Sequence, residues 1–357
     1  MKKLNVAIIG QGRSGRDIHG LYFKSELNTL YNVIAVVERD PERRERALKE
    51  YPGCEVFESY TELFGRKDID LVANASFSDE HYSVTKDLLE HDFNVVVEKP
   101  FARTRYECDD LIRIAKKRNL KLGVYHQSLF MEPYVHAKKV AASGKLGDIL
   151  QASIKYNWFA RRWDWQTTQT KVAGGIYNTG PHPIGFGLGF LDFDDNAYVA
   201  FSRLGKALTS GDSDDYAKII LTAPNKPVID IEVQSNDAFP DFRIKIVGTK
   251  GSYIAKGLDY QMKYIVDGEN PPRPVILESL KDKEGRPLYC GEQLIAHEEE
   301  GVLEENETGI GGSSKFYEMM YRTLTEDAPM EVPPEYAAKV ISVIETVHAT
   351  NPLPLIY

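Results

Sequence analysis

The chain of 357 residues is long enough for two domains, each with its own hydrophobic core. Its hydrophobic content of 42% and charged content of 27% are ordinary for a soluble globular protein, and a net charge of -9 argues against nucleic acid as a partner. Three widely spaced cysteines exclude a disulfide framework, and no apolar run reaches the ~20 residues of a membrane helix, so we expect a cytoplasmic protein without a membrane partner.

The first forty residues have the pattern of a dinucleotide-binding unit. Leu4 to Ile9 form an apolar run, which is typical of a strand buried in a parallel sheet. The run leads into Gly10-Gln11-Gly12-Arg13-Ser14-Gly15. In such a motif the first glycine permits a tight turn, the second lets backbone approach a pyrophosphate, and the third lets the next helix pack closely. A crossover helix is expected over 17–30 and a second strand over 33–37.

Glu38 and Arg39 follow the second strand and bear on the choice of cofactor. A carboxylate at this position can accept hydrogen bonds from an adenosine ribose, and it would repel the 2′-phosphate of NADP. Arg39 could instead bind that phosphate or stack on adenine. The pair favours NAD and leaves NADP open.

Strands and helices continue to alternate up to residue 125. We expect helices over 41–50 (with Asp40 as N-cap), 80–91 and 106–118, and strands over 69–74, 94–97 and 121–125. This α/β order predicts a doubly wound parallel sheet with right-handed crossovers, a Rossmann domain over residues 1–125.

Residues 126–357 have a different pattern and are expected to form a second, α+β domain. Helices are expected over 133–143, 314–327 and 334–349, and strands over 148–158, 196–203, 215–223, 227–235, 242–248, 251–256 and 260–266. Several strands alternate apolar and polar residues, which predicts a large, mostly antiparallel sheet with unlike faces. Residues 268–312 are polar and irregular, and His297-Glu298-Glu299-Glu300 within them is expected to be a solvated loop. The sequence leaves open whether the C-terminal helix packs back on the first domain.

Glu98-Lys99-Pro100 ends the strand over 94–97, at the sheet edge where open α/β sheets bind their ligands. A lysine at this edge could hydrogen-bond a substrate hydroxyl and stabilise developing alkoxide charge. Partial burial would also lower its pKa. A surface lysine at a strand end is the alternative interpretation.

Asn178 and His182 lie four residues apart in a stretch rich in glycine and proline, 173–183. If a helix begins there, the two side chains share one face. A histidine can accept the proton that an alcohol releases on oxidation, whereas a structural histidine in a turn is the alternative. The remaining histidines form no metal-binding pattern, so no metal site is predicted.

All three tryptophans lie within 158–165, in a segment that continues through Arg161-Arg162-Trp163-Asp164-Trp165-Gln166. Aromatic rings beside polar side chains suit a carbohydrate, because the rings stack on sugar faces while the polar groups bind hydroxyls. A tryptophan-anchored loop that covers the sheet is equally compatible with the pattern. The predicted substrate contacts are Tyr156, Arg162, Trp163, Asp164 and Trp165.

Taken together, these motifs resemble the Gfo/Idh/MocA family, which includes glucose-fructose oxidoreductase and inositol dehydrogenase. The resemblance covers nearly the whole chain and is carried by Gly10 to Gly15, Glu38 to Pro41, Ala75 to His81, Val95 to Phe101, Ala142 to Gly147 and Gly174 to His182. It implies a Rossmann domain followed by a domain with a large open sheet, through which copies form homodimers or homotetramers. It also implies NAD(P) in the crevice, catalytic roles for Lys99 and His182, and Ser76, His81 and Glu98 along the cofactor.

The sequence departs from the family pattern at two places near these residues. Asn178 stands where the family usually has aspartate, and an amide cannot stabilise an imidazolium as an anion would. His126-Gln127-Ser128 replaces an Asn-x-Arg-like pattern, so we expect His126 to contribute to a different substrate pocket.

The leading hypothesis is an NAD-dependent dehydrogenase acting on a secondary hydroxyl of a sugar, cyclitol or glycoside. In it His182 accepts the hydroxyl proton, Lys99 positions the oxygen and Asn178 orients. A second hypothesis is a glycoside-cleaving enzyme that retains its NAD through transient oxidation. A third is a non-catalytic NAD-sensing regulator, against which the presence of both Lys99 and His182 argues.

Overall fold

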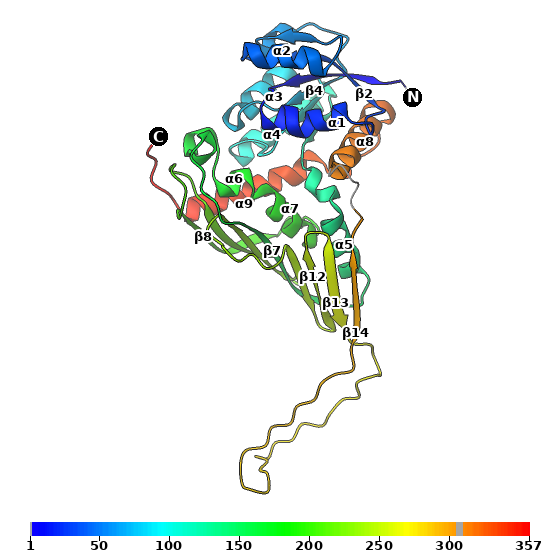
Figure 1. The fold of residues 1–357 in the computed structure, drawn as a ribbon, viewed down its shortest axis with the longest axis vertical. Coiled ribbons are helices and arrows are strands. Elements are labelled where there is room, and N and C mark those ends of the chain that lie inside the picture. The colour runs from blue at the N-terminus through cyan, green and yellow to red at the C-terminus, as the bar shows by residue number, and fades with distance from the viewer. Residues whose placement is uncertain (1, 305–309) are drawn as a thin grey trace.

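A computed structural model describes residues 2–304 and 310–357, which form two β-sheets with their associated helices (Figure 1). The first sheet is parallel throughout, in the order β3-β2-β1-β4-β5-β6, and confirms the predicted doubly wound topology. Its strands are β1 (Leu4–Ile9), β2 (Tyr31–Val37), β3 (Glu55–Phe57), β4 (Leu71–Asn74), β5 (Val95–Val97) and β6 (Leu122–Val124). The helices between them are η1 (Arg13–His19), α1 (Gly20–Lys24), α2 (Pro41–Glu50), η2 (Tyr60–Leu63), η3 (Ser78–Glu80), α3 (His81–Glu90) and α4 (Arg105–Arg118).

Local sequence explains most of this half. Strands β4 and β5 are completely buried, as their unbroken apolar runs predict. The side chain of Asp40 accepts hydrogen bonds from the first turn of α2, which confirms it as an N-cap. The first crossover helix ends at Lys24 rather than near residue 30. The side-chain amide of Asn28 donates to the carbonyls of Phe23 and Tyr31 at 2.8 and 3.0 Å, and such bonds from a side chain to the backbone compete with helix formation. The sequence does not predict β3, whose three residues are too short to show a period.

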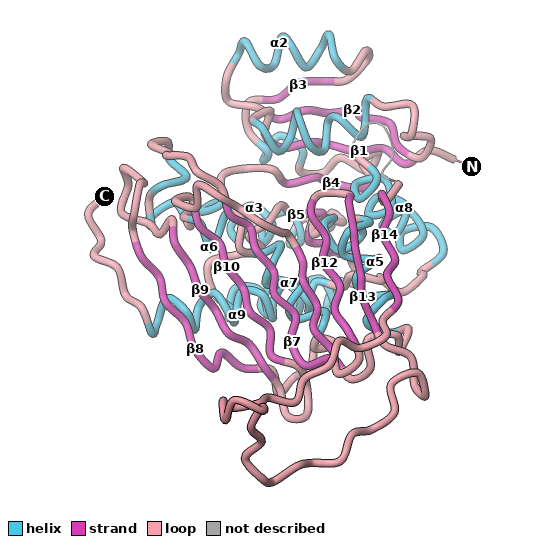
Figure 2. The backbone as a smooth tube through the Cα atoms, turned by 60° about the horizontal axis from the view of Figure 1, so that its bottom comes forward, coloured by secondary structure: helices cyan, strands magenta, loops and turns pink. Residues whose placement is uncertain are grey.

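The second sheet has the order β14-β13-β12-β11-β7-β10-β9-β8, in which β7 and β10 are parallel and the other pairs antiparallel. Its strands are β7 (Ile149–Asn157), β8 (Tyr198–Gly205), β9 (Tyr216–Thr222), β10 (Val228–Gln234), β11 (Ile244–Gly248), β12 (Gly251–Lys256), β13 (Asp259–Tyr264) and β14 (His297–Val302). The helices of this half are η4 (Gln127–Phe130), α5 (Glu132–Ala142), η5 (Trp165–Thr167), η6 (Gln169–Lys171), α6 (Gly175–Asn178), α7 (Pro181–Phe190), α8 (Gly311–Glu326) and α9 (Pro334–Thr350). Figure 2 shows the strands in front of the helices, so the sheet has one covered and one open face, and the predicted large antiparallel sheet is confirmed. None of the helices described is long and apolar enough to cross a membrane.

Two elements of this half differ from the prediction. The acidic run at 297–300 belongs to edge strand β14 and is not a loop. Its acids have basic partners: Glu298 pairs with Lys263 on the neighbouring strand β13, and Glu299 pairs with Lys145 from the connection after α5, each at 2.6 Å. Helix α7 is rich in glycine and therefore has little intrinsic helix propensity. Its glycines instead allow close packing, since a Cβ on Gly187 would lie 2.8 Å from a methyl group of Ile229 in β10.

The segment between β13 and β14 leaves the sheet as a long arm (Figure 1), in agreement with the irregular structure predicted there, although residues 305–309 of that prediction lie outside those described. At the C-terminus, α8 and α9 contact the first half of the chain. The hydroxyl of Tyr31 donates to the carbonyl of Tyr317 at 2.8 Å, and Lys116 of α4 pairs with Glu335 of α9 at 2.7 Å. These contacts hold the two sheets in one arrangement around the site described next.

Candidate functional site

The glycine loop after β1 is shaped by two tight contacts and one open position. A Cβ on Gly10 would lie 2.4 Å from the carbonyl oxygen of Ala75, and Gly10 has a φ of +89°. A Cβ on Gly15 would lie 1.8 Å from the carbonyl oxygen of Gly10. In contrast, the nearest atom to a Cβ on Gly12 is an Arg43 nitrogen at 3.9 Å. The chain itself therefore requires the first and third glycines, while the space beside the second is available to a ligand.

This contrast makes a prediction. Gly15→Ala is expected to lower stability by about 1–3 kcal/mol or to prevent folding, because backbone must move to admit the methyl group. Gly12→Ala, the matched control, is expected to keep the wild-type melting temperature and to bind NAD more weakly. Thermal unfolding and fluorescence titration with NAD measure the two effects. Equal melting temperatures for both variants would contradict the assignment.

Glu38 joins this loop to the end of β2. One carboxylate oxygen accepts from the backbone N–H of Gln11 at 2.7 Å and the other from that of Asp40 at 3.1 Å. Arg39 beside it is 68% exposed and pairs with Glu80 at 3.0 Å. The carboxylate is thus fixed at the sheet edge, whereas the guanidinium projects into solvent.

Two buried polar atoms near this loop lack a hydrogen-bond partner within the described residues: Oε1 of Gln11 and Oγ of Ser76. Ser76 follows β4, whose carboxyl end is adjacent to that of β1. Buried polar groups are normally hydrogen-bonded, so unsatisfied atoms on these two loops fit a polar ligand such as a dinucleotide. Within the described residues, no group of three or more His, Cys, Asp or Glu side chains is placed to hold a metal ion.

His81 and Glu98 lie behind the strand ends and support the backbone there. The ring nitrogens of His81 lie 2.6 Å from the carbonyl oxygen of Pro100 and 3.2 Å from that of Ser76. Glu98 is 2% exposed and accepts from the backbone N–H of Lys99 at 2.9 Å. Their contacts hold the segment that carries Lys99, and their predicted place along the cofactor stays a prediction.

His19 is a residue of this site that the motif analysis did not single out. It is completely buried in η1, with Nε2 3.2 Å from Glu98 and Nδ1 2.6 Å from the hydroxyl of Tyr317. Burial opposes ionisation of Glu98, yet the contact with His19 holds the pKa of that carboxyl below its ordinary value. The available signal was a histidine one helical turn after the last glycine of the motif.

Lys99 connects the two halves of the molecule. Its ammonium group donates to the backbone carbonyl of Asn178 at 2.9 Å. Burial lowers the pKa of Lys99, Glu98 opposes this effect, and the positive charges of Arg13 and Arg162 add to it. The lysine from the first sheet is thereby placed at the end of α6, four residues before His182.

Asn178 does not orient His182 as its spacing had suggested. Helix α6 ends at Asn178 and α7 begins at Pro181, so the two residues do not share one regular helix face. The Asn178 side chain donates to the carbonyl of Gln166 at 2.9 Å, whereas Nδ1 of His182 lies 2.8 Å from Oγ of Ser128. Ser128 is thus a partner of His182 that the sequence analysis did not predict. It lies in the segment 126–128, where the sequence departs from the family pattern.

His182 forms part of the wall of a cavity of about 370 Å³. The cavity is lined by Gln127, Ser128, Met131, Pro133, Tyr134, Tyr156, His182, Phe186, Arg243, Gly257 and Leu258. Burial, followed by the charges of Lys99, His126 and Arg243, lowers the pKa of His182 well below its ordinary value. The imidazole is therefore neutral at neutral pH and able to accept a proton.

Of the six residues predicted to contact a substrate, Tyr156 lines this cavity. His126 is 1% exposed and lies behind His182 with ring centroids 5.9 Å apart, and burial lowers its pKa to about 4. Trp163 is 75% exposed. Arg162 and Asp164 pair with each other at 2.6 Å, and Trp165 packs edge-on against Phe77 at 4.9 Å. The tryptophan segment thus lies over the loop after β4, and its role towards a substrate stays a prediction.

Asp214 is a second buried residue that the sequence did not reveal. Its carboxylate accepts from the N–H of Ile176 at 2.8 Å, and its carbonyl accepts from that of Gly175 at 2.7 Å. Burial raises its pKa to about 7. It anchors the first turn of α6, and through that helix the carbonyl that binds Lys99.

Comparison with known proteins matches both halves of the chain. A model described as "Oxidoreductase family, NAD-binding Rossmann fold" matches residues 4–126, and one described as "GFO/IDH/MocA C-terminal domain" matches residues 134–254. The uncharacterized oxidoreductase YhhX of Escherichia coli is 24% identical over 330 residues, which cover 91% of this chain and 90% of that protein. The scyllo-inositol 2-dehydrogenase (NADP(+)) IolW of Bacillus subtilis is 24% identical over 356 residues, which cover 96% and 92%.

Among solved structures, GenD2 from gentamicin A biosynthesis, determined in complex with NAD, has a TM-score of 0.78 and 16% identity, covering 98% of this chain and 94% of that one. A likeness at this level of identity establishes the fold. The motifs, the two sheets and the matches agree on one architecture.

Proposed function

Because the chain belongs to the Gfo/Idh/MocA family of NAD-binding oxidoreductases, we propose that it is a dehydrogenase acting on a secondary hydroxyl of a sugar, cyclitol or glycoside. The observation that carries the proposal is that Lys99, which follows β5 of the first sheet, reaches the end of α6, four residues before His182. Lys99 reaches the carbonyl of Asn178, and its charge contributes to the lowered pKa of His182. A cation whose charge acts on a neutral base suits the oxidation of an alcohol.

NAD is the cofactor that the site supports best. The loop Gly10 to Gly15, the carboxylate of Glu38 and the hydroxyl of Ser76 would hold it. When bound, it would accept a hydride from the carbinol carbon. The fixed carboxylate of Glu38 would oppose a 2′-phosphate, and Arg39, which could bind that phosphate, is exposed and already paired with Glu80.

In this proposal Lys99 stabilises the substrate oxygen, and His182 accepts the hydroxyl proton. The ammonium group of Lys99 donates a hydrogen bond to the substrate oxygen and stabilises negative charge that develops on it. Nδ1 of His182 lies 2.8 Å from Oγ of Ser128, a hydroxyl that can either donate or accept. In the tautomer in which Nδ1–H donates to Ser128, the lone pair of Nε2 is left to accept the hydroxyl proton.

The test is a screen of the purified protein against sugars, inositols and glycosides with NAD and with NADP, followed by absorbance of the reduced cofactor. We expect reduction of NAD with at least one polyol, and a lower kcat/KM with NADP. NAD binding without reduction across the panel would contradict the proposal. Release of an aglycone without net NADH would identify the glycoside-cleaving alternative instead.

A further inference from the structure

Arg243 is a half-buried cation on the wall of the cavity that contains His182. It lies one residue before β11, and its guanidinium carbon is 3.9 Å from the centroid of the Tyr156 ring. Its Nη1 donates to the carbonyl of Lys155 at 3.3 Å. Stacking on Tyr156 fixes the plane of the guanidinium, and four of its five N–H donors remain for other partners.

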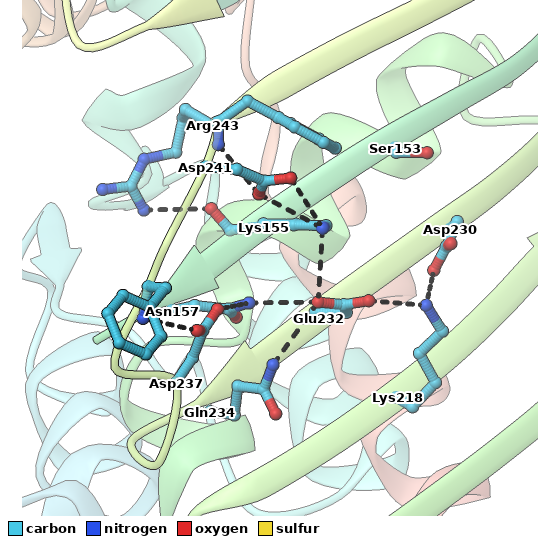
Figure 3. Close-up of polar contacts among 12 residues, drawn as sticks. Ser153, Lys155, Asn157, Lys218, Asp230, Glu232, Gln234, Asp237, Asp241 and Arg243 are labelled. Atoms are coloured by element: carbon cyan, nitrogen blue, oxygen red, sulfur yellow. Dashed lines mark hydrogen bonds and ion pairs between the residues drawn. The ribbon is translucent and has the colours of Figure 1, made fainter. Parts of the chain in front are cut away.

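The carboxylates nearest to Arg243 on strand β10 and before strand β11 pair with lysines. Figure 3 shows the guanidinium of Arg243 pointing away from Asp241, which pairs with Lys155 at 3.2 Å. Glu232 pairs with Lys218 at 2.8 Å on the same network. In residues 2–304 and 310–357, no carboxylate forms an ion pair with Arg243, and the residues that line the cavity include no acid.

A partly buried charge without a counter-ion is costly, and proteins usually pair such a group or keep it in water. Positive charge also acts at this place, because Lys99 and Arg243 both lower the pKa of His182. Arg13 adds to the positive charge around Lys99, and Glu98 offsets part of it. This occurs in a chain with a net charge of -9. The local excess of positive charge therefore marks the cavity as a place for an anion.

We propose that the substrate carries a carboxylate that Arg243 binds, so that the substrate class is a polyhydroxy carboxylic acid of monosaccharide size, such as a uronate or an aldonate. The inference rests on the proposed dehydrogenase function. A cavity of about 370 Å³ lies at the small end of ligand pockets. The planar fork of a guanidinium matches a carboxylate through two parallel hydrogen bonds.

A phosphate fits this wall less well. A sugar phosphate carries close to two negative charges, and the cavity lining offers one permanent cation, Arg243. The ammonium group of Lys99 is outside this lining and donates to the carbonyl of Asn178, where the reacting hydroxyl is expected. One guanidinium balances one carboxylate, with the hydroxyl to be oxidised directed towards His182.

The experiment compares matched acids and neutral sugars on the full-length protein. Turnover with NAD is measured for D-glucuronate, D-galacturonate and D-gluconate against D-glucose, D-galactose and myo-inositol, with glucose 6-phosphate as a separate arm. Binding of the same compounds to the NAD-loaded protein is measured by calorimetry. We expect the acids to bind and to have the higher kcat/KM.

Arg243→Gln is expected to lower kcat/KM and affinity for the acids by about 10- to 100-fold, mainly through KM, and to change kcat/KM for neutral sugars by a clearly smaller factor. Arg243→Lys, which preserves charge and bulk, should recover part of the loss. Lys245→Gln is the matched control, because it removes an exposed positive charge two residues away on β11 and should leave the acid preference intact.

The outcomes separate this inference from the proposed function. Turnover of neutral sugars with no preference for the acids, or equal effects of Arg243→Gln on both classes, would overturn the carboxylate site and leave the dehydrogenase intact. Preference for glucose 6-phosphate would also overturn it. Arg243-dependent binding of the acids without any reduction of NAD would support the carboxylate site and contradict the dehydrogenase.

Discussion

Replacing Lys99 with alanine is expected to lower kcat by about 10²- to 10⁴-fold, because the substrate oxygen loses its hydrogen-bond donor as negative charge develops. NAD should still bind, since the loop Gly10 to Gly15 and Glu38 are untouched. Stopped-flow or steady-state absorbance of NADH gives kcat, and a fluorescence titration gives the dissociation constant for NAD.

Lys121→Ala is the control for this variant. Lys121 lies one residue before β6, and its ammonium group pairs on the surface with Asp327. It should keep wild-type turnover. A Lys99→Ala enzyme that stays within about threefold of wild type would remove the basis for the role assigned to this residue.

The pH dependence of alcohol oxidation should reveal His182 as a base. Its neutral form accepts the proton, and burial together with Lys99, His126 and Arg243 lowers its pKa well below the ordinary value of 6.5. The neutral form therefore persists as the pH falls, and kcat/KM should decline only below pH 6.5. His182→Asn is expected to lose about 10²- to 10⁴-fold in kcat and to lose this acid limb.

Arg243→Gln tests whether the charge of Arg243 lowers the pKa of His182. Removing this positive charge should raise the pKa of His182, so the acid limb of kcat/KM should move to higher pH. The profile is measured with a neutral sugar, so that substrate binding by Arg243 does not enter. An acid limb at or above pH 6.5 in the wild type would contradict the lowered pKa.

The predicted parts of the site are those that depend on short-range sequence. The glycine loop, Glu38 and Lys99 each follow directly from a buried strand, so strand ends and motif spacing were enough to place them at one edge of the parallel sheet. The open antiparallel sheet was likewise visible in the alternation of β9 and β10, whose buried residues recur every second position.

The elements that the sequence did not predict depend on contacts with distant parts of the chain. Helix α7 is stabilised by burial against the sheet although its glycines disfavour a helix. Strand β14 tolerates its acids because Lys263 on β13 and Lys145 from the connection after α5 pair with two of them. The side chain of Asn178 bonds Gln166 because the helix is interrupted between α6 and α7, and residue spacing alone does not reveal this interruption.

By itself the sequence determined the family, the two sheets and the residues at the ends of the parallel strands, since local patterns of apolar residues and glycines are sufficient for these. The tertiary structure alone decided that Lys99 reaches the carbonyl of Asn178, that Ser128 holds His182, and that Arg243 lies on the cavity wall. Lys99 and Asn178 are 79 residues apart along the chain, and Ser128 and His182 are 54 residues apart. The contact of Lys99 joins the segment after β5 of the first sheet to helix α6. No local periodicity encodes such contacts, because they depend on how the two sheets and the helices between them pack together.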